Sequence, residues 1–215
     1  VKKYGVRNVM NTVKHYQEYS YDPVFGSRVP QVGLDKIVKA YKPSERLREI
    51  MKKPRDDLEL EVVELVDEIE RRIGIGISNI GIDGSILVGI HNPRYSDIDL
   101  VIYGCKESIY FAECLNSIKS LEKLPSDTAL KHLLSQSEIY GLSVDLIRSI
   151  QPPYKRLWFK GRREVNITFV DRHTYRYGDV VFKPLTPVEV TLNVEGGSCT
   201  SLFYPSYTYV NDVRT

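Results

Sequence analysis

The stretch GIDGSILVGIHNPRYSDIDLVIYG, residues 81–104, limits what this chain can fold into more than any other. It places Asp97 and Asp99 directly before an apolar run rich in β-branched residues, which is typical of a buried strand. Residues i and i+2 of a strand point to one face, about 6.6 Å apart along the chain. Ile98 and Leu100 then face the core. Ionised carboxylates at such a place are costly unless a positive group meets them.

Divalent cations are the positive groups that this pattern favours. Two carboxylates on one face suit Mg²⁺, which prefers oxygen ligands and shares its remaining positions with water and phosphate. A third carboxylate on a neighbouring strand would complete a two-metal site of the kind that supports displacement at phosphorus. Asp145 is the candidate, because it lies in the apolar run LSVDLIRSI, residues 142–150, which we interpret as another strand.

The turn at Gly84 and Ser85 fits the same chemistry. Glycine lets a backbone approach a phosphate closely. A helix beginning at Ser85 would offer free N–H groups to a triphosphate, and the serine hydroxyl adds a donor. Arg94, in the following loop, is a candidate phosphate ligand because its guanidinium group suits bidentate contacts.

The order Gly84–Ser85, eleven residues, then Asp97–Ile98–Asp99–Leu100 resembles the signature of the nucleotidyltransferase superfamily. That superfamily includes DNA polymerase β, the CCA-adding enzymes and the antitoxin-type nucleotidyltransferases. Asp83 stands where the family has a hydrophobic residue. Beyond this motif, the chain from YDPVFGSRVPQVGLDKI to RYGDVVFKPL looks similar to predicted archaeal nucleotidyltransferases.

The resemblance implies a fold, a reaction and a set of roles. Gly84 and Ser85 would hold the nucleotide phosphates, and Asp97 and Asp99 would bind two Mg²⁺ ions, with Mn²⁺ as an alternative. Asp145 would be the third metal ligand and could take the proton of the acceptor hydroxyl. The reaction would transfer a nucleoside monophosphate, for example from ATP, to that hydroxyl with release of pyrophosphate, with nucleic acid as the favoured acceptor. The alternatives are a catalytically silent member of the fold and a transferase that modifies a protein.

We expect an α+β protein with a polymerase β-like core, made of a short mixed sheet with helices, and a small β-rich C-terminal module. The predicted division is an N-terminal extension over 1–53, the core over 54–150 and the β-rich module over 151–215. Apolar residues at helical spacing predict a helix over 58–73 with a solvated acidic face. Further helices are expected over 108–124 and 126–140.

A basic and aromatic stretch opens the predicted C-terminal module. Cations that neutralise phosphates alternate there with aromatic rings that stack on unpaired bases. A nucleic-acid contact and a solvated linker that docks one tryptophan into the core are both open readings. The candidate nucleic-acid-binding residues are Lys155, Arg156, Trp158, Lys160, Arg162 and Arg163.

The net charge of +2 over 215 residues gives no general attraction to nucleic acid or membranes. Three scattered cysteines do not make a disulfide framework or a zinc site, so we expect free thiols in a reducing cytoplasm. No apolar run is long enough to span a bilayer. The sequence does not indicate the oligomeric state.

Overall fold

The computed structural model describes residues 18–173, 176–196, 198–203 and 206–214, and these form two compact units. The core unit comprises Tyr41–Arg172 and Val194–Tyr209. The hairpin unit comprises the described parts of Val1–Ala40, His173–Asn193 and Val210–Thr215. Among the described residues, no helix is both long and apolar enough to cross a lipid bilayer.

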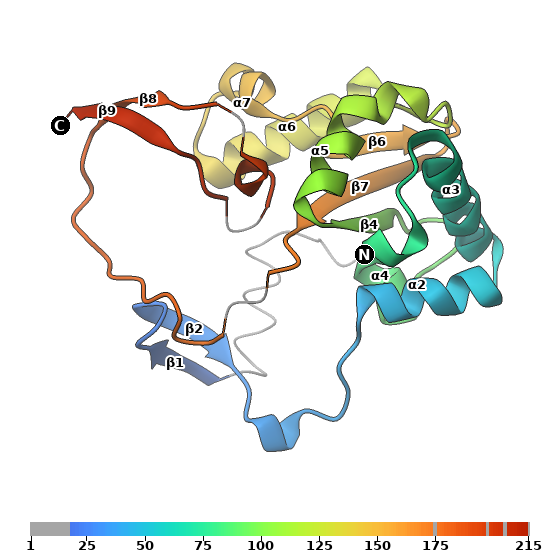
Figure 1. Ribbon diagram of the computed structural model, residues 1–215, viewed down its shortest axis with the longest axis horizontal. Helices are drawn as coiled ribbons and strands as arrows, with labels where there is room; N and C mark the ends of the chain where they lie inside the picture. Colours follow the sequence, from blue (N-terminus) through green and yellow to red (C-terminus); the bar gives the residue numbers. More distant parts are fainter. Residues whose placement is uncertain (1–17, 174–175, 197, 204–205, 215) are drawn as a thin grey trace. The chain divides into compact units, whose positions relative to one another are not determined.

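A mixed five-stranded sheet forms the centre of the core unit, in the order β3–β4–β7–β6–β5. Its strands β4, β7 and β6 lie side by side in Figure 1. β4 and β7 are parallel, and every other neighbouring pair is antiparallel. The strands are β3 (Ile80–Ile82), β4 (Ile98–Tyr103), β5 (Leu121–Lys123), β6 (Arg156–Phe159) and β7 (Arg163–Val170). The expectation of an α+β fold with a mixed sheet is confirmed.

Six α-helices accompany this sheet in the described part of the core unit. They are α2 (Pro43–Lys52), α3 (Asp57–Ile73), α4 (Gly84–Leu87), α5 (Cys105–Cys114), α6 (Ser126–Tyr140) and α7 (Val144–Ile150). Short 3₁₀ turns lie at Ile77–Asn79, Leu115–Ser117 and Cys199–Ser201. The predicted helices over 58–73 and 126–140 are confirmed as α3 and α6. The one expected over 108–124 is wrong beyond Cys114, because the chain turns and adds β5 to the sheet.

One face of the sheet carries the hydrophobic core. Alternate residues of β4 and β7, such as Ile98, Leu100 and Val165, pack in one buried cluster with residues of α2, α3 and α5 such as Leu65 and Phe111. Residues of intermediate burial alternate with the buried ones along β4, β6 and β7 and point to the opposite face. The opposite face is therefore where polar side chains can gather.

The division of the chain differs from the predicted boundaries at residues 53 and 150. α2 (Pro43–Lys52) belongs to the core unit, and its Leu47 and Ile50 are fully buried in the core. β6 and β7 are not part of a separate C-terminal module, because β7 pairs with β4 and β6 pairs with β7. A strand that is hydrogen-bonded on both edges is an internal strand of the sheet, so the core continues to Arg172.

The hairpin unit contains the antiparallel strands β1 (Glu18–Asp22) and β2 (Ser27–Gln31) and the 3₁₀ turn Leu34–Lys36. Asp22 accepts hydrogen bonds from the backbone N–H groups of Val24 and Phe25 and from the hydroxyl of Tyr177. β8 (Thr191–Val194) and β9 (Val210–Arg214) form a second two-stranded sheet. Residues 1–17 of the predicted extension lie outside the described residues.

A disulfide joins Cys105, the first residue of α5, to Cys199, and Cys114 is free. The expectation of three free thiols is therefore wrong for two of them. The sequence does not reveal this disulfide, because 94 residues separate the two cysteines. Only the fold brings their Cα atoms to 5.3 Å. Disulfides are uncommon in a reducing cytoplasm, so this bond gives no support to the expected location.

Candidate active site

The strand predicted after Asp97 is β4, and it begins at Ile98. Ile98 and Leu100 are buried in the core, whereas Asp97 and Asp99 are of intermediate burial. The alternation of a strand therefore sends both carboxylates to the face opposite the core, as the sequence predicts.

Strand pairing extends this pair into a row of polar side chains across the sheet. Asp83 directly follows β3, and its N–H donates to the Asp99 carbonyl at 2.8 Å. On the other side, Asp99 is the register partner of Asn166 in β7, and Asn166 is the partner of Arg156 in β6. Register partners point to the same face. The row therefore runs Asp83, Asp99, Asn166, Arg156, from acidic through neutral to basic.

The amide of Asn166 joins the two aspartates. Its Nδ2 donates to Asp97 Oδ2 at 2.8 Å and to Asp99 Oδ1 at 2.9 Å. The pKa of Asp99 is raised to about 6, because burial and the charge of Asp97 disfavour its ionised form. Asn166 opposes this shift through its hydrogen bond, Asp83 adds to it, and Arg156 opposes it. Two carboxylates thus converge on one small polar group.

Gly84 lies directly against Asp99. Its φ of +63° is in the left-handed region, and a Cβ at this position would lie 2.0 Å from Asp99 Oδ2. Both the backbone conformation and the contact therefore require glycine. Gly84 and Ser85 are the first two residues of α4, a single turn, so the expected helix start is confirmed to within one residue.

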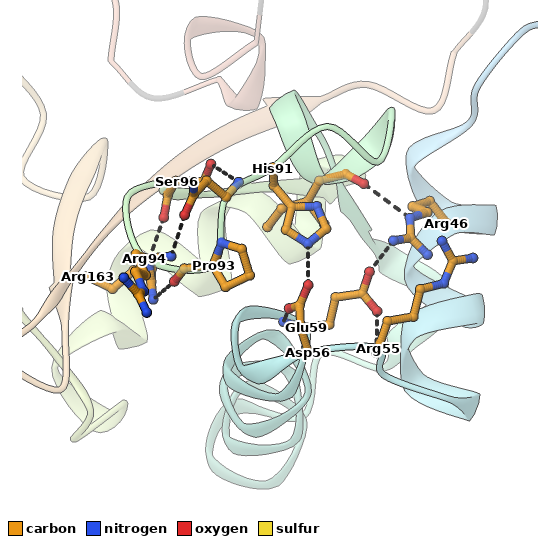
Figure 2. Close-up of polar contacts among 11 residues, drawn as sticks. Arg46, Arg55, Asp56, Glu59, His91, Pro93, Arg94, Ser96 and Arg163 are labelled. Carbon is orange, nitrogen blue, oxygen red and sulfur yellow. Dashed lines mark hydrogen bonds and ion pairs between the residues drawn. The ribbon is translucent and has the colours of Figure 1, made fainter.

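Two anchors fix the loop between α4 and β4 (Figure 2). At its start, His91 Nε2 lies 2.8 Å from Asp56 Oδ2, and the histidine side chain is only 7% exposed. At its end, the Arg163 guanidinium donates to the carbonyls of Pro93 at 2.8 Å and Ser96 at 2.6 Å. Arg94 is exposed, and its backbone N–H donates to Asn92 within the same loop.

A buried arginine fixes α4. Arg46 Nε donates to the Ile86 carbonyl at 3.1 Å, and its Nη2 pairs with Glu59, whose side chain is fully buried (Figure 2). The backbone N–H of Arg55 donates to the second Glu59 oxygen at 2.7 Å. Sequence patterns did not single out Arg46 or Glu59, because their roles depend on which segments the fold brings together.

One group of three possible metal ligands lies beside these anchors. Ligand atoms of Asp56, Glu59 and His91 lie within 4.8 Å of one another. However, Asp56 caps α3 by accepting from the Glu59 N–H, and both Glu59 oxygens already meet Arg46 and Arg55. The Arg46 guanidinium thus already compensates the charge of the Glu59 carboxylate without a metal ion. We assign these residues to support of the loop and α4.

Asp145 lies in a helix, so the predicted strand over 142–150 is wrong. Ser143 caps α7 by accepting from the Leu146 N–H, and Asp145 is in the first turn. Its side chain is 91% exposed and pairs with Arg148 at 3.1 Å. The strand position next to Asp99, where the third carboxylate is expected, belongs to Asn166.

The basic stretch forms the β6–β7 hairpin rather than a linker. Most of its cations pair with acids: Lys160 with Glu64 at 2.6 Å, Arg162 with Glu61 at 3.0 Å, and Arg163 with Glu61 at 2.6 Å. Arg156 pairs with Glu164 at 2.6 Å, Lys155 is exposed, and Trp158 is half-buried in β6. Part of the acidic face of α3 is therefore paired rather than solvated, and much of the predicted nucleic-acid patch is neutralised within the core unit.

Comparison of the chain with protein-family models, curated proteins and solved structures gave no match. The residues of the motif and the geometry of the row are therefore the observations that bear on function.

Proposed function

We propose that the protein is a metal-dependent nucleotidyltransferase with a polymerase β-like core, which transfers a nucleoside monophosphate from a nucleoside triphosphate to an acceptor hydroxyl. The observation that carries the proposal is that the carboxylates of Asp97 and Asp99 lie together on one face of the sheet, with Gly84 packed against Asp99. The glycine lets the backbone of the turn lie directly against the Asp99 carboxylate.

The residues at this site fit Mg²⁺. Two carboxylates that are close enough for one amide nitrogen to contact both present oxygen donors, which is the donor set that Mg²⁺ prefers. Asp97 and Asp99 would hold the metal, and the amide oxygen of Asn166 becomes available if the side chain turns over. When bound, Mg²⁺ neutralises charge on the reacting phosphates.

The remaining residues position these groups. Arg163 and His91 fix the ends of the loop that precedes Asp97, and Arg46 fixes α4 behind Gly84 and Ser85. In phosphoryl transfer, positioning and charge neutralisation dominate over covalent chemistry by the protein. A site with carboxylates on a strand and phosphate contacts on a buttressed turn meets both requirements.

Labelled nucleoside triphosphates test this proposal. The protein is incubated with each triphosphate in Mg²⁺ or Mn²⁺, together with tRNA, DNA, small hydroxyl compounds or cell protein, and transfer of label is followed. We expect transfer that requires the metal and disappears in the Asp97→Asn, Asp99→Asn double variant. Label on protein would favour the side-chain-modifying alternative. Absence of transfer with every acceptor class would refute the enzyme assignment.

The second candidate is a catalytically silent protein of this fold, and Asn166 is the observation that favours it. The amide N–H groups between the carboxylates provide, without any metal, part of the compensation that a cation would give. Nucleotide binding that does not need Mg²⁺ and survives loss of both aspartates would support this candidate.

A further inference from the structure

A second feature of the core unit lies at the basic end of the row. A cavity of about 480 Å³ opens between α6, α7, the end of β5 and the start of β6. This volume is within the range of small-ligand pockets. Arg156, the last residue of the row, forms part of its wall.

The wall is positively charged. Lys123, Arg148 and Arg156 line the cavity, and no acidic residue lines it. His132 also lines it, and its Nε2 lies 3.0 Å from Glu164 Oε2. Lys123 has no ion-pair partner among the described residues, and the partner of Arg148, Asp145, is largely exposed. Arg156 Nη1 binds Glu164, whereas its Nε is buried and without a hydrogen-bond partner in the described part of the chain. The cationic side chains that line the cavity favour an anionic ligand.

The rest of the lining is apolar or neutral. Leu124 and Leu133 contribute aliphatic surface, Pro152 and Pro153 contribute the apolar surface of their rings, and Gln151 adds one amide. Apolar surface with a few converging polar groups is the usual composition of a small-molecule site. The complementary ligand has an anionic group at one end and a flat or apolar group at the other, as a nucleotide has.

The sheet relates this cavity to the proposed metal site. Asp99, Asn166 and Arg156 lie on three adjacent strands, β4, β7 and β6. With strands about 4.8 Å apart, Arg156 lies about 10 Å from Asp99 along the row. Gly84, the proposed triphosphate contact, lies on the other side of Asp99. Donor and acceptor would therefore approach the aspartates from opposite sides.

We propose that this cavity binds the phosphate-bearing part of the acceptor, so that the acceptor is a nucleotide, either free or at the end of a nucleic acid strand. This inference rests on the proposed function, because only a transferase has an acceptor. The binding of a nucleotide phosphate in the cavity does not require the metal site.

Trp158 provides the measurement. It is the only tryptophan of the chain and lies two residues from Arg156 on the same face of β6. The full chain without divalent metal is titrated with adenosine monophosphate, adenosine and a short single-stranded oligonucleotide, and tryptophan fluorescence is followed. We expect saturable binding of the monophosphate or the oligonucleotide and at least about tenfold weaker binding of adenosine, because adenosine lacks the phosphate that makes charge-assisted hydrogen bonds.

Three variants make the test specific. Lys123→Gln together with Arg148→Gln is expected to weaken phosphate binding at least about tenfold. The matched control is Lys131→Gln, which removes a cation from α6 that does not line the cavity and is expected to bind normally. The order of affinity of the free and strand-borne nucleotide identifies the source of the phosphate.

Two results would overturn the proposal: equal affinity for adenosine and the monophosphate, or unchanged binding in the double variant. The Asp97→Asn, Asp99→Asn variant separates this test from that of the proposed function. It should retain phosphate binding at the cavity while losing transfer. Transfer that persists in the wild type without any phosphate binding at the cavity would refute only the acceptor site.

Discussion

Replacing Asn166 with aspartate tests the centre of the proposed site. The change keeps the side-chain shape but exchanges the Nδ2 group, which donates to Asp97 at 2.8 Å and to Asp99 at 2.9 Å, for a third carboxylate oxygen. Without metal, the variant loses two charge-assisted hydrogen bonds and gains a like charge next to two others. With metal, it gains a ligand of the kind that the resemblance implies.

The cost can be worked from these contacts. Three ionised carboxylates would repel by about 4 kcal/mol per pair at 4 Å and an effective dielectric of 20. Protonation of Asp99 avoids this repulsion at a smaller free-energy cost, about 1.4 kcal/mol at pH 7 for a pKa of about 6. Its proton then replaces one of the two donors, so one bond worth about 1.5 to 3 kcal/mol is lost. The free energy of unfolding should fall by about 3 to 4 kcal/mol.

Denaturant unfolding with and without Mg²⁺ measures this loss. We expect the deficit to shrink by about 1.4 kcal/mol at pH 5, where protonation of Asp99 costs little. We also expect Mg²⁺ to bind the variant at least about tenfold more tightly than the wild type, because a carboxylate replaces an N–H donor. Thr168→Asp, an exposed position two residues along the same face of β7, is the control. If the metal-free Asn166→Asp protein is as stable as the wild type, the amide does not join the aspartates.

Three further predictions concern neighbouring groups. The pKa of Asp99 is raised from 3.8 to about 6, so the free energy of unfolding of the metal-free protein should rise by about 2 to 3 kcal/mol as the pH falls from above 6 to below 3.8. Asp99→Asn should remove this pH dependence, which pH-dependent unfolding measures. Gly84→Ala should weaken Mg²⁺ binding measured calorimetrically, because the added Cβ would meet Asp99. Gly89→Ala is the control: it has a similar positive φ but no atom within 4 Å of the added Cβ, so its only expected effect is about 1 to 2 kcal/mol of backbone strain. Arg163→Met should destabilise the fold by about 3 to 5 kcal/mol in thermal or chemical unfolding, because it leaves Glu61 Oε2 and two loop carbonyls without their donor. The exposed Arg162→Met should cost about 1 kcal/mol or less, and equal losses for the two arginines would refute the loop anchor.

Local patterns were sufficient for the parts of the fold that local physics decides. Helix α3 has a capping aspartate, apolar residues at helical spacing and a C-terminal Gly74, and its observed bounds agree with the prediction. Strand β4 has an apolar β-branched run. The side of the strand on which Asp97 and Asp99 lie followed from alternation alone.

The other features of the fold and of the site depend on contacts between segments that lie far apart in the sequence. Asn166 carries no signal of its own in the sequence, and only the parallel register of β4 and β7 places it beside Asp99. The apolar flanks of Asp145 suit a strand or a short helix equally, and the Ser143 cap decides for the helix. The basic stretch looked available for nucleic acid because its acidic partners, such as Glu61 and Glu64, lie about a hundred residues earlier in the chain.

The row across the sheet has a polarity that a single strand could not provide. Its negative end at Asp83 and Asp99 and its positive end at Arg156 come from separate strands, with a neutral amide between them. Carboxylates can hold a polyphosphate only through a metal ion, whereas Arg156 can pair with a phosphate directly, so the two ends of the row suit different groups. Which substrate donates the transferred group and which accepts it would then depend on the order of the strands in the sheet rather than on any one residue.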